Sequence, residues 1–343
     1  MELREILQTL CAINAPSGFE QPVGAWAADY LAPFADEVRQ DAMGNLIAVK
    51  RCGRPGAKKL MLDAHMDEVG FVVTGYEKGG YLRFSALGGI DARMLPTLGV
   101  TVLTQPPLYG VIDTMPPHIL SEEDMKQAVP IDRLVIDTGL TEEEARRLIP
   151  IGTGVSYAVG MTELMGGRLC GKSFDDRSCA AILLRAFEEL SQKELSVDLY
   201  CVLSAQEEVG CRGAKAAAGG ILPDYAIVVD VTHANTPDEH SLTVELGGGA
   251  AVGIGPNMNH AMTQHILRLA KREDIPVQKE VCPGGSSGTN AAVIQVSGCG
   301  VATALLSLPL RYMHSPSEVI DFADMENTLR LITAFVPELE AEA

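Results

Sequence analysis

The stretch VDLYCVLSAQEEVG, residues 197–210, is a largely apolar run that ends in two adjacent glutamates, Glu207 and Glu208. Consecutive apolar residues without alternation are typical of a strand buried on both faces, as in a parallel sheet. A helical pattern precedes this run at 175–192, and further apolar runs at 225–232 and 301–308 are separated by a helical pattern at 259–274. This alternation of helices and buried strands predicts an α/β domain with a largely parallel sheet.

Residues 68–163 have a different character. They are rich in glycine, proline and short alternating runs such as GFVVTGY (70–76) and YGVIDT (109–114). Many short strands separated by turn signals predict a small β-barrel or sandwich. This insertion would divide the α/β domain into two parts, residues 1–67 and 164–343.

The bulk properties exclude several classes of protein. The 343 residues carry a formal net charge of −18, which disfavours nucleic acid and anionic membranes as partners. We find neither an apolar stretch of about 20 residues nor a secretory signal pattern, so we expect a cytoplasmic protein. The eight cysteines show no C-x-x-C spacing, which argues against a zinc site made of thiolates and favours reduced, mostly buried thiols.

Polar side chains that can bind metals stand at the ends of the predicted strands. Ligands of open α/β sheets collect at the carboxyl ends of strands, so we expect these side chains to meet at one edge. The candidate residues are His65 and Asp67, Asp175 and Asp176 before a helix, Glu207 and Glu208, Asp230, and His314. This mixture of nitrogen and oxygen donors suits zinc, cobalt or manganese, and it can hold two ions if one carboxylate bridges them.

Each candidate has an ordinary structural explanation when it is considered alone. A histidine at a strand end is usually a satisfied polar residue, and paired acids before a helix commonly serve as its N-cap. The shared placement of the candidates favours the metal site. The other histidines lack that placement and are expected to be surface or hydrogen-bonding residues, although His233 lies close to Asp230; they are His118, His233, His240, His260 and His265.

Five motifs resemble one family in order and spacing. HMDEVGF (65–71), FDDR (174–177), QEEVGCRGA (206–214), VVDVTHA (228–234) and YMHSP (312–316) are similar to motifs of the dinuclear aminopeptidases of the tetrahedral and glutamyl aminopeptidase group, some of which are labelled endoglucanases. The resemblance covers essentially the whole chain. It implies a zinc-exopeptidase-like α/β/α domain, a β-barrel insertion used for dimerisation, short peptide substrates, and a homo-oligomer that is a dimer or a dodecamer.

The resemblance also implies a role for each site residue. Asp175 would bridge two divalent ions, zinc or cobalt being favoured over manganese. His65 and Asp230 would complete one ion site, and Glu208 and His314 the other. Asp67 would hydrogen-bond His65, Glu207 would be the general base, and the peptide bond between Asp175 and Asp176 would be cis.

Two departures and three alternatives accompany this interpretation. Asn290 replaces an aspartate expected near the substrate, and Cys179 stands where a smaller residue is common. A related dinuclear dipeptidase or deacylase is the main alternative. A glycosidase, which needs two carboxylates and no metal, would leave both histidines without a role, and a non-catalytic binding protein would not need an intact ligand set.

Overall fold

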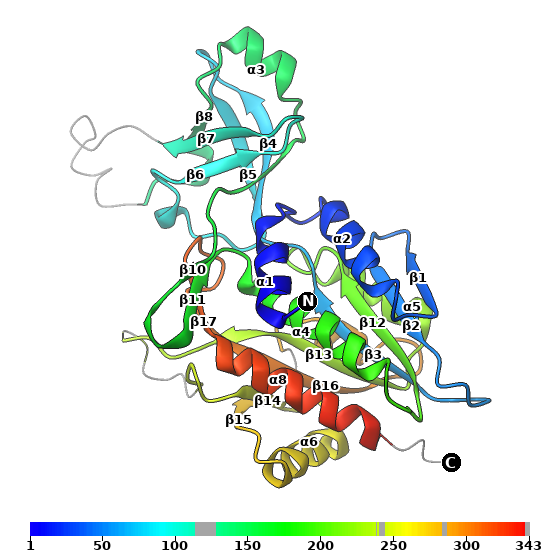
Figure 1. Cartoon of the computed structure of the whole chain (residues 1–343). Helices are drawn as coiled ribbons and strands as arrows, with labels where there is room; N and C mark the ends of the chain where they lie inside the picture. The colour runs from blue at the N-terminus through cyan, green and yellow to red at the C-terminus, as the bar shows by residue number, and fades with distance from the viewer. Residues whose placement is uncertain (114–127, 238, 240–243, 283–286, 340–343) are drawn as a thin grey trace.

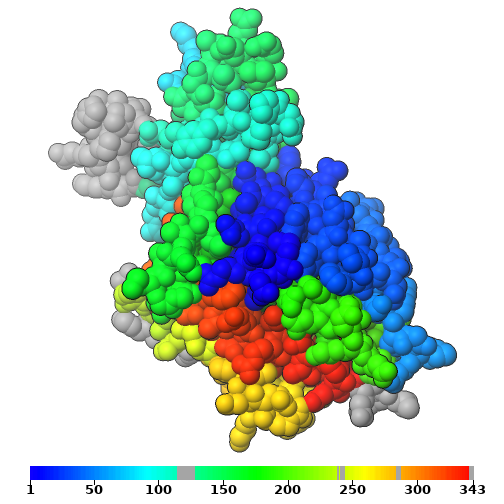
Figure 2. Space-filling model, in the orientation of Figure 1, coloured from blue at the N-terminus to red at the C-terminus, as the bar shows by residue number. Residues whose placement is uncertain are grey.

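The computed structural model of the chain describes residues 1–113, 128–237, 239, 244–282 and 287–339. A large layered body carries the main sheet, and a smaller β-rich body is joined to it (Figure 1). The smaller body projects from the larger one in the space-filling view (Figure 2). Within the described residues, no helix is both long enough and apolar enough to cross a membrane.

The main sheet has the strand order β1-β2-β12-β3-β13-β16-β17-β11-β10, and β14 and β15 branch from β16. Its four central strands, β12, β3, β13 and β16, are parallel, whereas the strands on both sides of them pair antiparallel. The bounds are β1 (Glu37–Gln40), β2 (Leu46–Lys50), β3 (Lys59–His65), β10 (Thr162–Glu163), β11 (Arg168–Gly171), β12 (Asp198–Ser204), β13 (Tyr225–His233), β14 (Ala250–Ile254), β15 (Val277–Val281), β16 (Ala302–Arg311) and β17 (Glu318–Asp321).

The sheet is therefore mixed: it is parallel at its centre and in the outlying pair β14–β15, and antiparallel elsewhere. The prediction of a largely parallel sheet missed the flanks. Some of these strands are joined by short connections, such as the one between β1 and β2, which can only join antiparallel strands. Others, such as β2 with β12, pair antiparallel although they lie far apart in the chain. The central apolar strands from which the prediction was made are the parallel ones.

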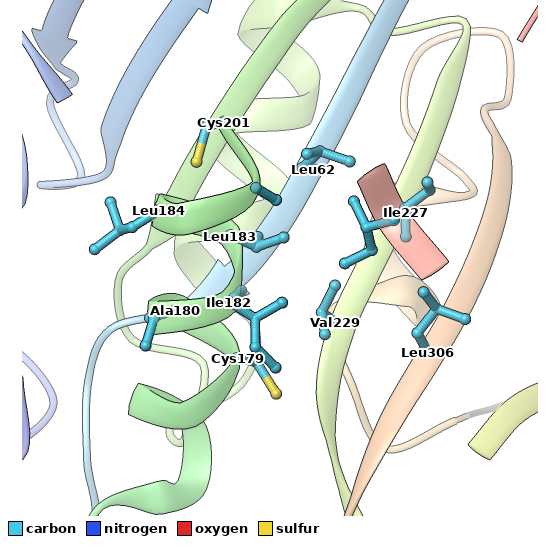
Figure 3. Packing of buried hydrophobic residues seen from close by; sticks show 14 of the residues in the cluster. Leu62, Cys179, Ala180, Ile182, Leu183, Leu184, Cys201, Ile227, Val229 and Leu306 are labelled. Carbon is cyan, nitrogen blue, oxygen red and sulfur yellow. The ribbon is translucent and has the colours of Figure 1, made fainter. Parts of the chain in front are cut away.

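Helices cover both faces of the sheet, as the α/β/α expectation requires. Residues of α1, α2, α4, α6 and α8 share one buried cluster with one face of the sheet, and α5 and α7 pack on the other face. Figure 3 shows Ile182 and Leu183 of α4 facing Val229 of β13 and Leu306 of β16. The helices are α1 (Leu3–Ala12), α2 (Gln21–Leu31), α4 (Phe174–Leu190), α5 (Arg212–Ile221), α6 (His260–Arg272), α7 (Ala291–Ile294) and α8 (Phe322–Phe335), with short 3-10 turns at Met165–Gly167 and Val336–Glu338.

The smaller body is a closed barrel with the strand order β4-β5-β8-β7-β6-β9. Phe71 is central to its core, since its ring meets those of Phe84 and Tyr157 edge-on at centroid distances of 5.1 and 5.6 Å. Its elements are β4 (Gly70–Tyr76), β5 (Leu82–Leu87), β6 (Gly99–Val102), β7 (Leu108–Asp113), β8 (Val135–Asp137), α3 (Glu142–Leu148) and β9 (Gly154–Tyr157), with 3-10 turns at Ala92–Met94 and Ile131–Arg133. The barrel strands thus lie inside the predicted insertion, but β10, at the end of residues 68–163, pairs with β11 in the main sheet.

Candidate metal centre

Five segments deliver the predicted ligands to one edge of the main sheet. His65 ends β3 and is the register partner of Ser204 at the end of β12, so the turn that carries Glu207 and Glu208 starts beside it. Asp230 lies on β13, and Asp175 lies at the start of α4. His314 lies in the turn between β16 and β17. The parallel register of the central strands is what brings these distant segments together.

The ligands form two groups that share Asp175. His65, Asp175 and Asp230 make one group, and Asp175, Glu208 and His314 make the other. Oδ1 of Asp175 lies 3.0 Å from Nε2 of His65, and Oδ2 lies 3.3 Å from Nε2 of His314. Nε2 of His314 is also 3.2 Å from Oε2 of Glu208. Asp175 thus presents one oxygen to each group, as a bridging carboxylate does.

The charges of the site fit bound cations. Burial raises the pKa of Glu208 to about 7, and the neighbouring Asp175 carboxylate adds to the rise. Burial and the Asp176 carboxylate raise the pKa of Asp230. Oε1 of Glu208 is buried and has no hydrogen-bond partner among the described residues. Buried carboxylates of this kind need a compensating charge, and two divalent ions would supply it to a donor set of imidazole nitrogens and carboxylate oxygens.

Asp67 supports the site rather than lining its centre. Its carboxylate accepts hydrogen bonds from the backbone N–H groups of Glu207 and Glu208 at 3.0 and 3.2 Å, and from the hydroxyl of Ser17 at 2.5 Å. Nδ1 of His65 lies 3.4 Å from the Asp67 carboxylate but only 3.1 Å from the Asp67 backbone carbonyl. The main chain of Asp67 therefore contributes to orienting His65, as well as its carboxylate.

The two adjacent glutamates have different surroundings. Glu208 belongs to a ligand group, whereas Glu207 belongs to neither group found among the described residues. Glu207 lines the cavity beside the ligands, and its Oε1 accepts a hydrogen bond from Sγ of Cys211 at 3.1 Å. Burial raises the pKa of Glu207 above its usual range, which brings a carboxylate closer to the basicity that proton transfer near neutral pH requires.

Sequence reasoning missed two parts of the site. Glu318, which is buried, accepts hydrogen bonds from the backbone N–H groups of Asp175 (3.2 Å) and His314 (2.9 Å), and so fixes one ligand of each group. A glutamate in the strand after YMHSP gave no sequence signal. The second part is Gly88–Gly89, which follows barrel strand β5; the carbonyl of Gly89 lies 2.7 Å from Nδ1 of His314.

The two noted departures do not reach the substrate cavity. Asn290 is buried, and its amide donates to Oδ2 of Asp63 and Oγ of Ser204, both at 2.8 Å. It does not line the cavity that the described residues form around the proposed ligands, although Thr289 and Ala292 beside it do. Its effect on the substrate side stays a prediction, and its side chain belongs to a buried polar network with Asp63 and Ser204. Cys179 is buried in the core cluster with Val229 (Figure 3).

The remaining predictions on local structure are settled by simple observations. The Asp175–Asp176 peptide bond is cis, as the resemblance implied. All eight cysteines lie in the described part of the chain and are unpaired; Cys299 is exposed and Cys52, Cys170 and Cys211 are partly exposed, so fewer are buried than expected. His233 lines the cavity outside both ligand groups, His260 begins α6, and His265 pairs with Glu338. His118 and His240 lie outside the described residues.

Comparisons with known proteins identify the family of the chain. A model of the family described as M42 glutamyl aminopeptidase matches residues 44–331. A lysyl aminopeptidase of Pyrococcus furiosus is 36% identical over 342 residues, which cover 98% of this chain and 97% of that protein. Among solved structures, the Pyrococcus horikoshii TET1 peptidase superposes with a TM-score of 0.88 at 31% identity, covering 98% of this chain and 100% of that one. A Thermotoga maritima protein described as an endoglucanase has a TM-score of 0.79 at 34% identity, covering 97% and 96%.

These matches span nearly the whole chain and include both the sheet and the barrel, so the resemblance drawn from the five motifs is confirmed. The chain belongs to the M42 glutamyl aminopeptidase family and is an aminopeptidase, a hydrolase of peptide bonds.

Proposed function

We propose that the chain is a dinuclear metallo-aminopeptidase that releases the N-terminal residue of short peptides. The observation that supports this most directly is Asp175, whose two carboxylate oxygens lie 3.0 and 3.3 Å from the two histidines of separate ligand groups. A shared ligand of this kind can hold two ions at the short separation of two-ion hydrolytic sites, about 3.5–4 Å. His65 and Asp230 would complete one ion site, and Glu208 and His314 the other.

The chain's own groups supply the proton transfers. Bound divalent ions would polarise the scissile carbonyl and make water a stronger nucleophile. Glu207 accepts the proton of the attacking water and returns it to the leaving amine. Asp67 holds the backbone of Glu207 and Glu208 by two hydrogen bonds, so that base and ligand keep a fixed separation.

The donor set favours zinc or cobalt, and manganese is the third choice. Imidazole nitrogen is common around zinc and cobalt, whereas carboxylate oxygen also suits manganese. Each proposed site contains one histidine and carboxylates. This mixture suits borderline ions such as zinc and cobalt and, less well, the harder manganese ion.

The chain divides by this proposal into a catalytic domain of residues 1–67 and 164–343 and a dimerisation domain of residues 68–163. The barrel exposes Tyr109 and Ile151, whose relative accessibilities are 64% and 62%. Aromatic residues are enriched at protein interfaces, and we assign these two side chains to the dimer contact. A symmetric dimer could then form an edge of a larger closed shell such as a dodecamer, in line with the tetrahedron or octahedral shell described for the TET1 peptidase. Such a particle, acting in the cytoplasm, would admit short peptides.

Release of the first residue from a peptide series tests the function. The protein is stripped with a chelator and reloaded separately with zinc, cobalt and manganese, and metal content is measured alongside activity. We expect hydrolysis of peptides with a free N-terminus, no hydrolysis of their N-acetylated forms, and loss of activity in the stripped protein. Equal activity on acetylated peptides would favour a deacylase, cleavage of dipeptides alone would favour a dipeptidase, and full activity without metal would refute the proposal.

A further inference from the structure

One acidic side chain in the cavity has no role in the proposed chemistry. Glu280 lies on β15 and lines the same cavity, of about 510 Å³, as the proposed ligands and Glu207. Its Oε1 accepts a hydrogen bond from the hydroxyl of Thr232. Its Oε2 is buried and has no hydrogen-bond partner among the described residues. A carboxylate oxygen in that state is unfavourable unless another group binds to it.

The position of Glu280 follows from strand geometry. Asp230 and Thr232 are two residues apart on β13, so their side chains project from the same face of the strand. Two residues along a strand correspond to about 7 Å. The Glu280 carboxylate, which is hydrogen-bonded to Thr232, therefore lies at a distance from Asp230 that the length of a long side chain can span.

The charge balance of the cavity leaves Glu280 without a counter-charge. Two divalent ions would balance four carboxylates, those of Asp175, Glu207, Glu208 and Asp230. None of the described residues that line the cavity is a lysine or an arginine. The negative charge of Glu280 is thus available to bind a positively charged group of the substrate.

We propose that Glu280 binds the positively charged side chain of the substrate's N-terminal residue, so that the enzyme prefers peptides that begin with lysine or arginine. This inference rests on the proposed aminopeptidase function. The flexible stem of lysine ends in a compact ammonium group that can donate to Oε2 of Glu280, while Oε1 keeps its hydrogen bond with Thr232. The hydrogen bond would be charge-assisted, and these are the stronger kind.

A pair of substrates of matched shape tests the preference. The 4-nitroanilides of lysine and norleucine share the same four-carbon stem and differ by the terminal ammonium. We expect the intact metal-loaded protein to hydrolyse the lysine compound with a kcat/KM about 10- to 100-fold higher, the range expected for a hydrogen bond between charged groups. The arginine and citrulline compounds should differ in the same direction.

The variant Glu280→Gln removes the charge but keeps the shape and an acceptor for Thr232. Its kcat/KM for lysine should fall by about tenfold or more, whereas its value for norleucine should stay within about twofold of the wild type. Glu326→Gln, on the exposed face of α8, is the matched control and should change neither value.

The outcomes separate the inference from the function on which it rests. Absence of hydrolysis of every substrate with a free N-terminus by the metal-loaded protein would refute the proposed function. Norleucine hydrolysed as fast as lysine by the wild type would refute the role of Glu280 and leave the function standing, and this comparison does not depend on any variant folding. An equal loss on lysine and norleucine in Glu280→Gln, with unchanged metal content and melting temperature, would also refute that role, because Glu280 would then act on a part common to all substrates.

Discussion

Replacing Glu207 and Glu208 with glutamine, one at a time, should impair the enzyme in two different ways. The residues are adjacent, yet Oε2 of Glu208 lies 3.2 Å from Nε2 of His314 within a ligand group, whereas Oε1 of Glu207 lies 3.1 Å from Sγ of Cys211. Glutamine keeps the size of both side chains. It removes the negative charge that a metal ligand supplies and the basic oxygen that a general base needs.

The expected magnitudes follow from these two roles. Glu207→Gln should retain both metals and substrate affinity but lose about 10²- to 10⁴-fold in kcat, the usual contribution of general acid–base catalysis. Loss of a group that only orients a ligand already costs about 10- to 100-fold in metal affinity. Glu208→Gln removes a direct ligand charge, so we expect a loss of metal affinity of at least about 100-fold and partial recovery of activity as the metal concentration is raised.

The assay is a metal titration of activity, with bound metal measured by elemental analysis in the same samples. Glu326→Gln, an exposed substitution of the same type on α8, provides the baseline. If added metal restores Glu207→Gln as fully as Glu208→Gln, or if Glu207→Gln keeps near-normal turnover, the assignment of base and ligand is wrong.

Three further predictions concern Asp67, the buried pair of Glu68 and Lys172, and the barrel surface. Asp67→Asn should lower kcat by about 10- to 100-fold, because a neutral amide cannot accept from both backbone N–H groups of the 207–208 turn as well as from Ser17; a kcat within twofold of the wild type in steady-state assays would contradict this. Glu68→Gln should lower the free energy of unfolding by about 3–5 kcal/mol, since it leaves the buried ammonium of Lys172, now 2.6 Å from Glu68, without its partner. Burial opposes the ionisation of Glu68, but Lys172 and Arg177 lower its pKa to about 2, below the ordinary value of 4.5. The stabilisation by this pair should therefore be complete at neutral pH and be lost as the pH falls from about 4.5 towards 2. Denaturant titrations that show the same acid dependence in the wild type and in Glu68→Gln would refute this prediction. Finally, light scattering should show a dimer or larger particle that the double variant Tyr109→Glu, Ile151→Glu dissociates, and a monodisperse wild-type monomer would rule out the barrel contact.

The sequence was most informative where the chain is buried on both sides. Continuous apolar runs identified the central strands β12, β13 and β16, and because parallel strands end at one edge, the polar residues after them could be placed together without coordinates. The barrel was predictable from short alternating runs in the same way. These patterns work because burial constrains every residue in a central strand.

Features that depend on tertiary context gave no such signal. The antiparallel flanks include pairs joined by short connections, such as β1 with β2, and pairs between distant strands, such as β2 with β12; apolar runs reveal neither kind of partner. Glu318 is an ordinary glutamate in the sequence, and only the return of β17 beside β16 aims it at the backbone of Asp175 and His314. Asn290 was placed near the substrate because its motif is near it, but the helical start of α7 turns its side chain to Asp63. In each case the direction of one side chain decides the role, and sequence spacing does not give that direction.

The barrel insertion contacts the candidate metal site and is also a candidate interface. The Gly89 carbonyl lies 2.7 Å from Nδ1 of His314, and this contact selects the ring orientation in which Nε2 faces the Asp175 and Glu208 carboxylates. A Cβ at Gly89 would come within 3.2 Å of Nδ1 of His314, and one at Gly88, whose φ is +91°, within 2.7 Å of a Val69 methyl carbon. A side chain at Gly88 would be strained by the positive φ and the close contact, and one at Gly89 would require His314 to shift by a few tenths of an ångström. The insertion therefore contacts the second ligand group directly, through Gly89 and His314. We expect a change in the packing of the barrel to move His314 even where the main sheet is unchanged.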